Sequence, residues 1–245
     1  MTRQPVPLAA IAHRGSSLAH PENTMEAFRA AQAEGADMIE LDVRLSRDGQ
    51  LIVHHDARLS AERLPVDSLT RAELRQLASH VPTLEEVLWW ASDRIGVYVE
   101  LKAEGTAAPT AGLVRSLGMA EQVIAGSFQP GLVEELRAQA PEIPRSVLVR
   151  AVDRAGLLRL GSELATRFLH PCWERAAPAP HRLLDAEFLV AVRSAGRGLI
   201  LWQEDREEEL EQLVRLRPAG ICTNVPARLV AVRRRLRDEE EPRAA

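Results

Sequence analysis

The sequence is poor in cysteine, in aromatic residues and in long apolar runs, and each shortage excludes a class of protein. The only cysteines are Cys172 and Cys222, too few for a disulfide framework and wrongly spaced for a zinc site, so we expect two reduced thiols in or near the core. No stretch approaches the roughly 20 apolar residues that span a bilayer, and the run Leu8–Ala12 is too short for a signal peptide. We therefore expect a cytoplasmic protein without stable membrane insertion.

Neither the charge nor the aromatic content suits a nucleic-acid partner. The formal net charge is -4 and aromatic residues make up 4% of the chain, so we expect neither a basic surface nor a base-stacking surface. Hydrophobic residues at 46% and charged residues at 27% are the balance of an ordinary globular domain. The composition leaves the oligomeric state open.

Short apolar runs alternate with longer amphipathic segments along the chain. The runs, which we interpret as strands, are Leu8–Ala12, Met38–Leu45, Gly96–Leu101, Gln122–Gly126, Arg145–Val149, Ala165–His170, Gly198–Trp202 and Ala219–Thr223. The segments, which we interpret as helices, are Thr24–Glu34, Thr83–Ser92, Thr110–Leu117, Gly131–Ala140, Arg154–Leu160, Asp185–Ala195, Glu207–Arg215 and Ala227–Leu236. Such alternation favours a parallel sheet with crossover helices.

This pattern predicts an α/β fold, a single (β/α)8 TIM barrel with residues 1–245 as one domain. An open doubly wound sheet is the alternative, but the G-x-G-x-x-G loop that would favour it is absent after the first strand. Asp48-Gly49 lies between two extended runs, which predicts a hairpin turn and a small β-hairpin arm after the second strand, returning along Leu51–His54. Residues 237–245 form a charged tail that we expect to be frayed and without function.

Polar residues gather where the first predicted strand ends, at the end of a barrel that carries active sites. His13 and Arg14 lie at this point, although they could also be a simple local pair in a loop. Asn23 or Thr24 can cap the following helix, and that task is enough to explain both. Glu22 has no such structural task, so it is a further candidate.

Two acids share one face of the second predicted strand. Side chains alternate along a strand, so Glu40 and Asp42 point one way and Leu41 and Val43 the other. The apolar pair should face the helices and the acids the barrel axis. Buried neighbouring carboxylates are costly unless a cation compensates them, and a hard divalent metal would do so. Neutralisation by Arg or Lys is the alternative.

The third predicted strand repeats the pattern. Glu100 and Lys102 share one face, so Glu100 could be a third oxygen ligand and Lys102 a partner for a phosphate oxygen. A simple ion pair between these two side chains is the alternative.

The predicted hairpin arm ends in two histidines and an acid. His55 with His13 would supply the two imidazoles that a reaction with one acid and one base requires. Asp56 could orient His55 through a ring nitrogen. His54 should point to the opposite side of the arm, which favours His55. Together with the acids and cations, these residues fit metal-assisted phosphoryl chemistry.

Several motifs carry a family resemblance. They are AHRGSSLAHPENTMEAF, GADMIELDVRLSRDGQLIVHHD, PTLEEVL and YVELK, with weaker similarity at GSF, LILW and GICTNVPARL. On these motifs the chain resembles the glycerophosphodiester phosphodiesterase family over nearly its whole length. The resemblance implies a βα barrel, a divalent cation (Mg²⁺ or Ca²⁺), and a small-molecule substrate, a glycerophosphodiester hydrolysed to sn-glycerol 3-phosphate and an alcohol.

The resemblance also implies roles for individual residues. These are His13 and His55 as the catalytic acid and base, Arg14 and Lys102 as phosphate ligands, Trp202 as part of the glycerol pocket, and Glu40, Asp42 and Glu100 as metal ligands. It further implies attack by the glycerol 2-hydroxyl, with one histidine taking its proton, the other protonating the leaving alcohol, and water then opening the cyclic phosphate. Which histidine does which stays open.

The chain departs from the family pattern in two places. Gln203-Glu204-Asp205 follows Trp202 where relatives carry a Thr-Val-Asn-like run, and Ser60–Arg63 replaces an Asp-Arg-Thr-Thr-like run. These changes bear on the headgroup pocket and leave the catalytic set whole. His170, at the end of the sixth predicted strand, either reaches the site or forms a structural His-Pro turn.

Two other functions remain as alternatives. A lysophospholipase D or phospholipase C-like barrel phosphodiesterase would need an exposed apolar rim, and no loop shows an aromatic cluster. A non-catalytic phosphate-binding barrel would be expected to have lost a histidine or a metal acid, and none is lost.

Overall fold

Parallel strands close into a barrel in the computed structural model, which describes residues 8–59, 63–150, 154–172 and 179–240. The sheet runs β1-β9-β8-β7-β6-β5-β4-β2, and pairing of β1 with β2 closes it. Its strands are β1 (Ala9–His13), β2 (Met38–Leu45), β4 (Gly96–Leu101), β5 (Val123–Ser127), β6 (Arg145–Val149), β7 (Phe168–Pro171), β8 (Gly198–Leu201) and β9 (Gly220–Thr223). The predicted TIM barrel is confirmed.

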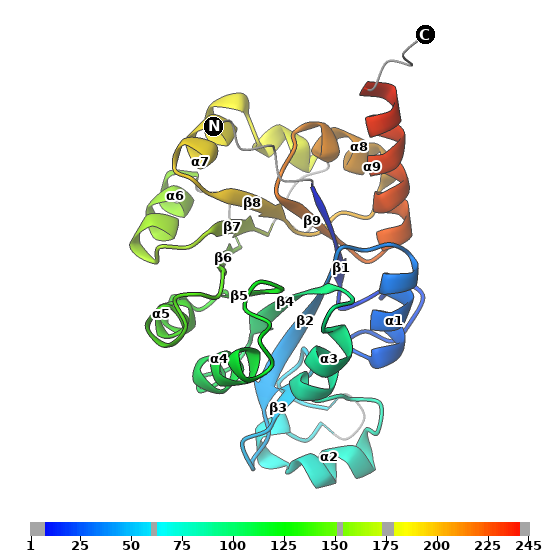
Figure 1. Cartoon of the computed structure of the whole chain (residues 1–245), viewed down its shortest axis with the longest axis vertical. Coiled ribbons are helices and arrows are strands. Elements are labelled where there is room, and N and C mark those ends of the chain that lie inside the picture. The colour runs from blue at the N-terminus through cyan, green and yellow to red at the C-terminus, as the bar shows by residue number, and fades with distance from the viewer. Residues whose placement is uncertain (1–7, 60–62, 151–153, 173–178, 241–245) are drawn as a thin grey trace.

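Helices surround the strands (Figure 1). They are α1 (Met25–Ala33), α3 (Leu84–Ala91), α4 (Ala107–Ser116), α5 (Pro130–Gln139), α6 (Arg154–Glu163), α7 (Ala186–Ser194), α8 (Glu207–Arg215) and α9 (Pro226–Glu240). Each follows a predicted segment with small shifts at its ends. None of the helices in the described part of the chain combines the length and apolarity that a membrane span requires.

Two predicted boundaries are wrong. The sixth predicted strand, which is β7, starts at Phe168 rather than Ala165. Ala165 takes a positive φ of 48°, and its backbone N donates to Ser162 O at the end of the preceding helix. The expected frayed tail is wrong for residues 237–240, since α9 continues to Glu240. Glu239 pairs with Arg215 of α8 at 3.4 Å, which holds this last turn. Residues 241–245 lie outside the described ranges.

The predicted hairpin arm is present. β3 (Leu51–Val53) pairs antiparallel with β2, with Val43 opposite Val53. Beyond it the chain forms a short 3-10 helix at Val66–Ser68 and α2 (Arg71–Leu77), neither of which was expected. They enclose a small separate core, formed by Ile52, Leu59, Val66, Leu74, Ala78 and Val81, and this sub-core supports the arm that carries His55.

The core confirms the side-chain alternation expected for β2. Leu41 and Val43 pack among the buried residues of α3, such as Leu84 and Leu88. A second group fills the barrel interior, formed by Ile11, Tyr98, Leu148, Cys172, Ile200, Trp202 and Cys222. The two cysteines are therefore buried thiols, as expected.

Candidate active site

Three carboxylates meet at the carboxyl ends of β2 and β4. Asp42 is paired in register with Glu100, and Glu40 precedes Asp42 by two residues on the same face. One carboxylate oxygen from each of the three lies within 4.8 Å of the others, and all three residues are buried. The alternation along two neighbouring strands thus produces an acidic cluster, which we call the carboxylate cluster.

Two cations pair with this cluster. Arg14 Nε lies 3.0 Å from Asp42 Oδ2, and its backbone N donates to Glu40 Oε2 at 3.0 Å. Lys102 Nζ lies 2.7 Å from Glu100 Oε1 and 3.4 Å from Asp42 Oδ1. The ion pairs considered from the sequence are therefore present. When all three carboxylates are ionised, the two cations leave one negative charge, which a further cation can neutralise.

Glu22 belongs to this network through Arg14. Both of its carboxylate oxygens accept from Arg14 Nη1 at 3.0 Å, and its side chain is half exposed. Gly15, which follows Arg14, has a φ of +87°, and a Cβ there would lie 2.6 Å from that of Ala27. The turn after His13 therefore packs directly against α1, and this contact holds Arg14 at the cluster.

The cluster holds protons unevenly. Burial first, and then the charge of Asp42, raises the pKa of Glu40 well above its ordinary value and that of Glu100 to about 7. For Asp42 burial also acts upward, but Arg14 and then Lys102 outweigh it and lower the pKa of this carboxyl. Asp42 is thus the anion that stays ionised, whereas Glu100 releases its proton only near neutral pH.

These shifts predict a pH-dependent stability. In the unfolded chain the carboxyl of Glu100 is ionised above pH 6.5, whereas in the folded protein its pKa of about 7 keeps part of the proton bound. His13 and His170 act in the opposite direction, because they are neutral in the folded protein and half protonated at pH 6.5 in the unfolded one. The contribution of Glu100 is therefore measured as the difference between the wild type and Glu100→Gln, which keeps both histidines. Stability falls with pH wherever the folded state binds more protons. Between pH 6.5 and 8 the free energy of unfolding of the metal-free wild type should therefore fall by about 1 kcal/mol relative to that of Glu100→Gln. Urea unfolding at each pH measures it.

The control for this prediction is Glu100→Gln. This variant lacks the proton of Glu100 and also lacks a charge that raises the pKa of Glu40, while His13 and His170 are unchanged. An equal change of stability in the two proteins over this range would show that Glu100 does not hold the proton.

The donor set fits a hard divalent cation. Within the described ranges, the buried Glu100 Oε2 has no hydrogen-bond partner, and the buried Asp42 Oδ1 has none beyond its 3.4 Å ion pair with Lys102. Unpartnered buried oxygens are costly, and carboxylate oxygens are the ligands that Mg²⁺ and Ca²⁺ prefer. The cluster can thus hold one divalent cation.

His13 lies at the end of β1 beside the cluster. Its Nδ1 is 2.8 Å from Asn224 Oδ1, and its Nε2 is 4.0 Å from Glu40 Oε2. Nε2 is buried without a hydrogen-bond partner among the described residues. Burial, and then the charge of Arg14, lowers the pKa of His13 to about 4, so this imidazole is neutral at pH 7.

His55 lies at the end of the hairpin arm and is more accessible, with a side chain 34% exposed. Its Nδ1 is 2.8 Å from Asp56 Oδ1, the contact expected if Asp56 orients the ring. The arm is fixed to β2, because the backbone N of His54 donates to Asp42 O at 3.0 Å. The His54 ring turns elsewhere, with Nε2 3.2 Å from Arg58 O. The charge of His55 contributes to lowering the pKa of Asp42, which indicates that His55 lies on the side of the acids.

Aromatic rings form one wall of the site. Trp202 lies with its ring centroid 5.1 Å from His13 and 5.6 Å from Phe128. On another side it contacts His170 at 5.6 Å. His170 is buried inside the barrel, with Nδ1 2.9 Å from the Tyr98 hydroxyl, and burial followed by the charge of His13 lowers its pKa to about 3. It supports Trp202 and has no contact with the carboxylate cluster.

Asn23 binds Asp42 instead of capping α1, a role not expected from the sequence. Thr24 caps α1, accepting from Ala27 N, so the cap expected from either residue belongs to Thr24 alone. Asn23, at a φ of 57°, instead donates to Asp42 Oδ2 at 2.9 Å and accepts from Asp42 N at 3.3 Å. One feature of the sequence indicated this role of Asn23: Asn23 and Thr24 are both capping residues, and α1 needs only one cap.

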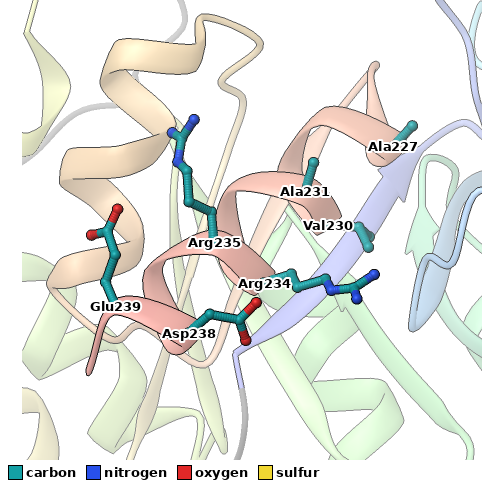
Figure 2. Close-up of a pocket in the computed structure, with 7 residues that line it drawn as sticks. All are labelled: Ala227, Val230, Ala231, Arg234, Arg235, Asp238 and Glu239. Atoms are coloured by element: carbon teal, nitrogen blue, oxygen red, sulfur yellow. The ribbon is translucent and has the colours of Figure 1, made fainter. Parts of the chain in front are cut away.

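A surface hollow elsewhere has no part in this chemistry. Figure 2 shows it along α9, where all of its lining residues belong to that one helix: Ala227, Val230, Ala231, Arg234, Arg235, Asp238 and Glu239. It contains none of the residues discussed above, so the candidate site is the cluster at the barrel mouth.

Known proteins share both the sequence and the fold. Residues 13–228 match the glycerophosphoryl diester phosphodiesterase family. A glycerophosphodiester phosphodiesterase of Caldanaerobacter subterraneus is 29% identical over 90% of this chain and 95% of its own length. The crystal structure of one from Agrobacterium tumefaciens is 30% identical, with a TM-score of 0.79, over 90% of this chain and 98% of that one.

A further structure is that of an Oleispira antarctica phosphodiesterase in complex with the product sn-glycerol-3-phosphate. It is 25% identical, with a TM-score of 0.77, over 93% of this chain and 96% of that one. The expected enzyme class, a phosphoric diester hydrolase, is confirmed by these relatives. The family match covers well over half of the chain, so the protein belongs to the glycerophosphoryl diester phosphodiesterase family.

Proposed function

We propose that this chain hydrolyses glycerophosphodiesters to sn-glycerol 3-phosphate and an alcohol, with one Mg²⁺ or Ca²⁺ held by Glu40, Asp42 and Glu100. The observation that carries the proposal is the convergence of this acidic cluster with two basic side chains and a buried neutral imidazole at one barrel mouth. The sn-glycerol-3-phosphate in the Oleispira antarctica relative supports the same product.

Arg14 and Lys102 bind the phosphodiester. Both side chains are 13% exposed, and each pairs with a different carboxylate oxygen of Asp42. They can therefore donate to two non-bridging oxygens of the phosphodiester without moving far. When bound, the divalent cation acts as a Lewis acid on a phosphoryl oxygen. Glu22 holds Arg14 from outside and so directs the guanidinium toward the phosphate.

His13 acts as the base. Its ring is neutral because burial and Arg14 keep its pKa at about 4, and its free Nε2 faces the cluster. It removes the proton from the glycerol 2-hydroxyl, whose oxygen then attacks phosphorus. Trp202 lies against His13 and covers the carbon chain of the glycerol at the point of attack.

His55 acts as the acid. It is the more exposed of the two histidines, at the side from which a headgroup can leave. Its ring gives a proton to the departing alcohol oxygen, with Asp56 on Nδ1 holding the ring in orientation. In the second half, the neutral His55 takes a proton from water, which opens the cyclic phosphate, and His13 returns its proton to the 2-oxygen.

Product identity tests this proposal. Incubation of the protein with glycerophosphocholine and Mg²⁺ or Ca²⁺, followed by ³¹P NMR, should show sn-glycerol 3-phosphate and free choline. Lysophosphatidylcholine in parallel should react at least about tenfold more slowly, since the described loops around the site present no cluster of exposed aromatic side chains for its acyl chain. Phosphocholine as product, a faster reaction with the lysolipid, or binding without turnover would each reject the proposal, and the last two would favour the alternatives named from the sequence.

A further inference from the structure

Two polar residues, Asp205 and Asn224, form a hydrogen-bonded pair behind His13. Asp205 follows β8 and Trp202, and Asn224 follows β9. Asn224 Nδ2 donates to Asp205 Oδ2 at 2.7 Å, while Asn224 Oδ1 faces His13 Nδ1 at 2.8 Å. The carboxylate, the amide and the imidazole therefore form one continuous line that ends at the cluster.

The carboxylate of Asp205 fixes the orientation of the amide. Its Oδ1 accepts from Thr223 Oγ1 and from the backbone N of Asn224, both at 2.8 Å. Its Oδ2 accepts from Asn224 Nδ2 and, at 3.3 Å, from Gln203 Nε2. Because an ionised carboxylate only accepts hydrogen bonds, the amide must turn its nitrogen toward Asp205, and its oxygen must then face His13.

The amide in turn determines which nitrogen of His13 carries the proton. An amide oxygen can only accept, so Nδ1 of His13 must be the donor, and in the neutral ring Nε2 is then left with its lone pair. Ser17 Oγ, 2.8 Å from the same amide oxygen, also holds it in place. We propose that Asp205 and Asn224 are positioning residues, which fix the Nδ1–H tautomer of His13 and direct its bare Nε2 at the substrate. This inference rests on the proposed function of His13.

Exchanging the acid and the amide between positions 205 and 224 tests this hydrogen-bonded line. In Asn224→Asp, two carboxylates would meet at the 2.7 Å contact, which disrupts the line. In the double variant Asp205→Asn with Asn224→Asp, the amide at 205 donates to the carboxylate at 224, whose other oxygen accepts from His13 Nδ1. A merely structural defect would not be repaired by this second change, whereas a hydrogen-bonded line would be.

Kinetics with glycerophosphocholine provide the first readout. Asn224→Leu and Asn224→Asp should each lower kcat about 100-fold, the scale of loss for a misplaced catalytic group, with KM changed less than about threefold. The double variant should recover to within about fivefold of wild type. Glu204→Gln is the matched control, since Glu204 is a buried acid beside Asp205 that pairs with Arg206 and should leave kcat unchanged.

¹⁵N NMR of the histidine rings provides the second readout, independent of turnover. In the wild type and in the double variant, the ring assigned to His13 (identified by its loss in His13→Ala) should be protonated at Nδ1. In Asn224→Leu it should lose this preference. A wild-type ring protonated at Nε2, or a double variant no better than Asn224→Asp, would overturn the inference. An inactive wild type with the Nδ1–H tautomer would instead reject the proposed function alone.

Discussion

His55→Ala should lower kcat for glycerophosphodiester hydrolysis by about 10²- to 10⁴-fold, the range by which a positioned acid accelerates a reaction. His54→Ala, one residue away, should leave kcat within about twofold, because its ring contacts Arg58 O and points away from the acids. Both side chains lie on the same exposed arm, so a loss of folding would affect the two variants alike. Coupled detection of sn-glycerol 3-phosphate measures the difference.

His13→Ala should cause a comparable loss by removing the base. Its ring is buried, so the variant could also be less stable, and its melting temperature should be measured beside kcat. Near wild-type turnover in His13→Ala or His55→Ala, or an equal loss in His54→Ala, would mean that the two histidines are not the acid and base.

Removal of divalent metal should have the second large effect. Dialysis against EDTA should lower kcat by at least about 10²-fold, because loss of one electrostatic contact with the transition state typically has an effect of this size. Excess Mg²⁺ or Ca²⁺ should restore kcat. Metal binding should also raise the melting temperature, since a ligand present at 100 times its Kd stabilises by about 2.7 kcal/mol. Full activity in metal-free buffer would contradict the role of the cluster.

A pair of variants links this effect to the cluster. Glu40→Gln should weaken Ca²⁺ binding, measured by calorimetry, at least tenfold, because it removes one of three anionic ligands. Glu204→Gln removes a similarly buried carboxylate that pairs with Arg206 and lies outside the cluster. The Ca²⁺ affinity of this variant should match that of the wild type. Equal affinity in both variants would place the metal elsewhere.

The barrel was predictable because each of its strands is a short apolar run set between helical segments. α2 was not, although Thr70 and Glu73 form the same capping box as Thr83 and Glu86. That helix is short, and its single buried residue, Leu74, gives no periodic pattern. Helices of this kind are stabilised by tertiary contacts, here by the small core of the arm.

The acids of the site were also predictable, because alternation along β2 and β4 is a local rule. The supporting residues were not. Asn224 lies 211 residues from His13 and still meets its Nδ1, and only closure of the barrel by β9 beside β1 brings them together. One signal existed, since Asp205 lies in the segment that departs from the family pattern, but its partner could not be named without the fold.

A crystal structure with Ca²⁺ and sn-glycerol 3-phosphate tests most directly whether one site performs this chemistry. It should show the ion on carboxylate oxygens of Glu40, Asp42 and Glu100, and the phosphate on Arg14 and Lys102. His13 Nε2 should lie within hydrogen-bond reach of the glycerol 2-hydroxyl. A metal bound to other residues, or a phosphate bound away from this barrel mouth, would contradict a single convergent site.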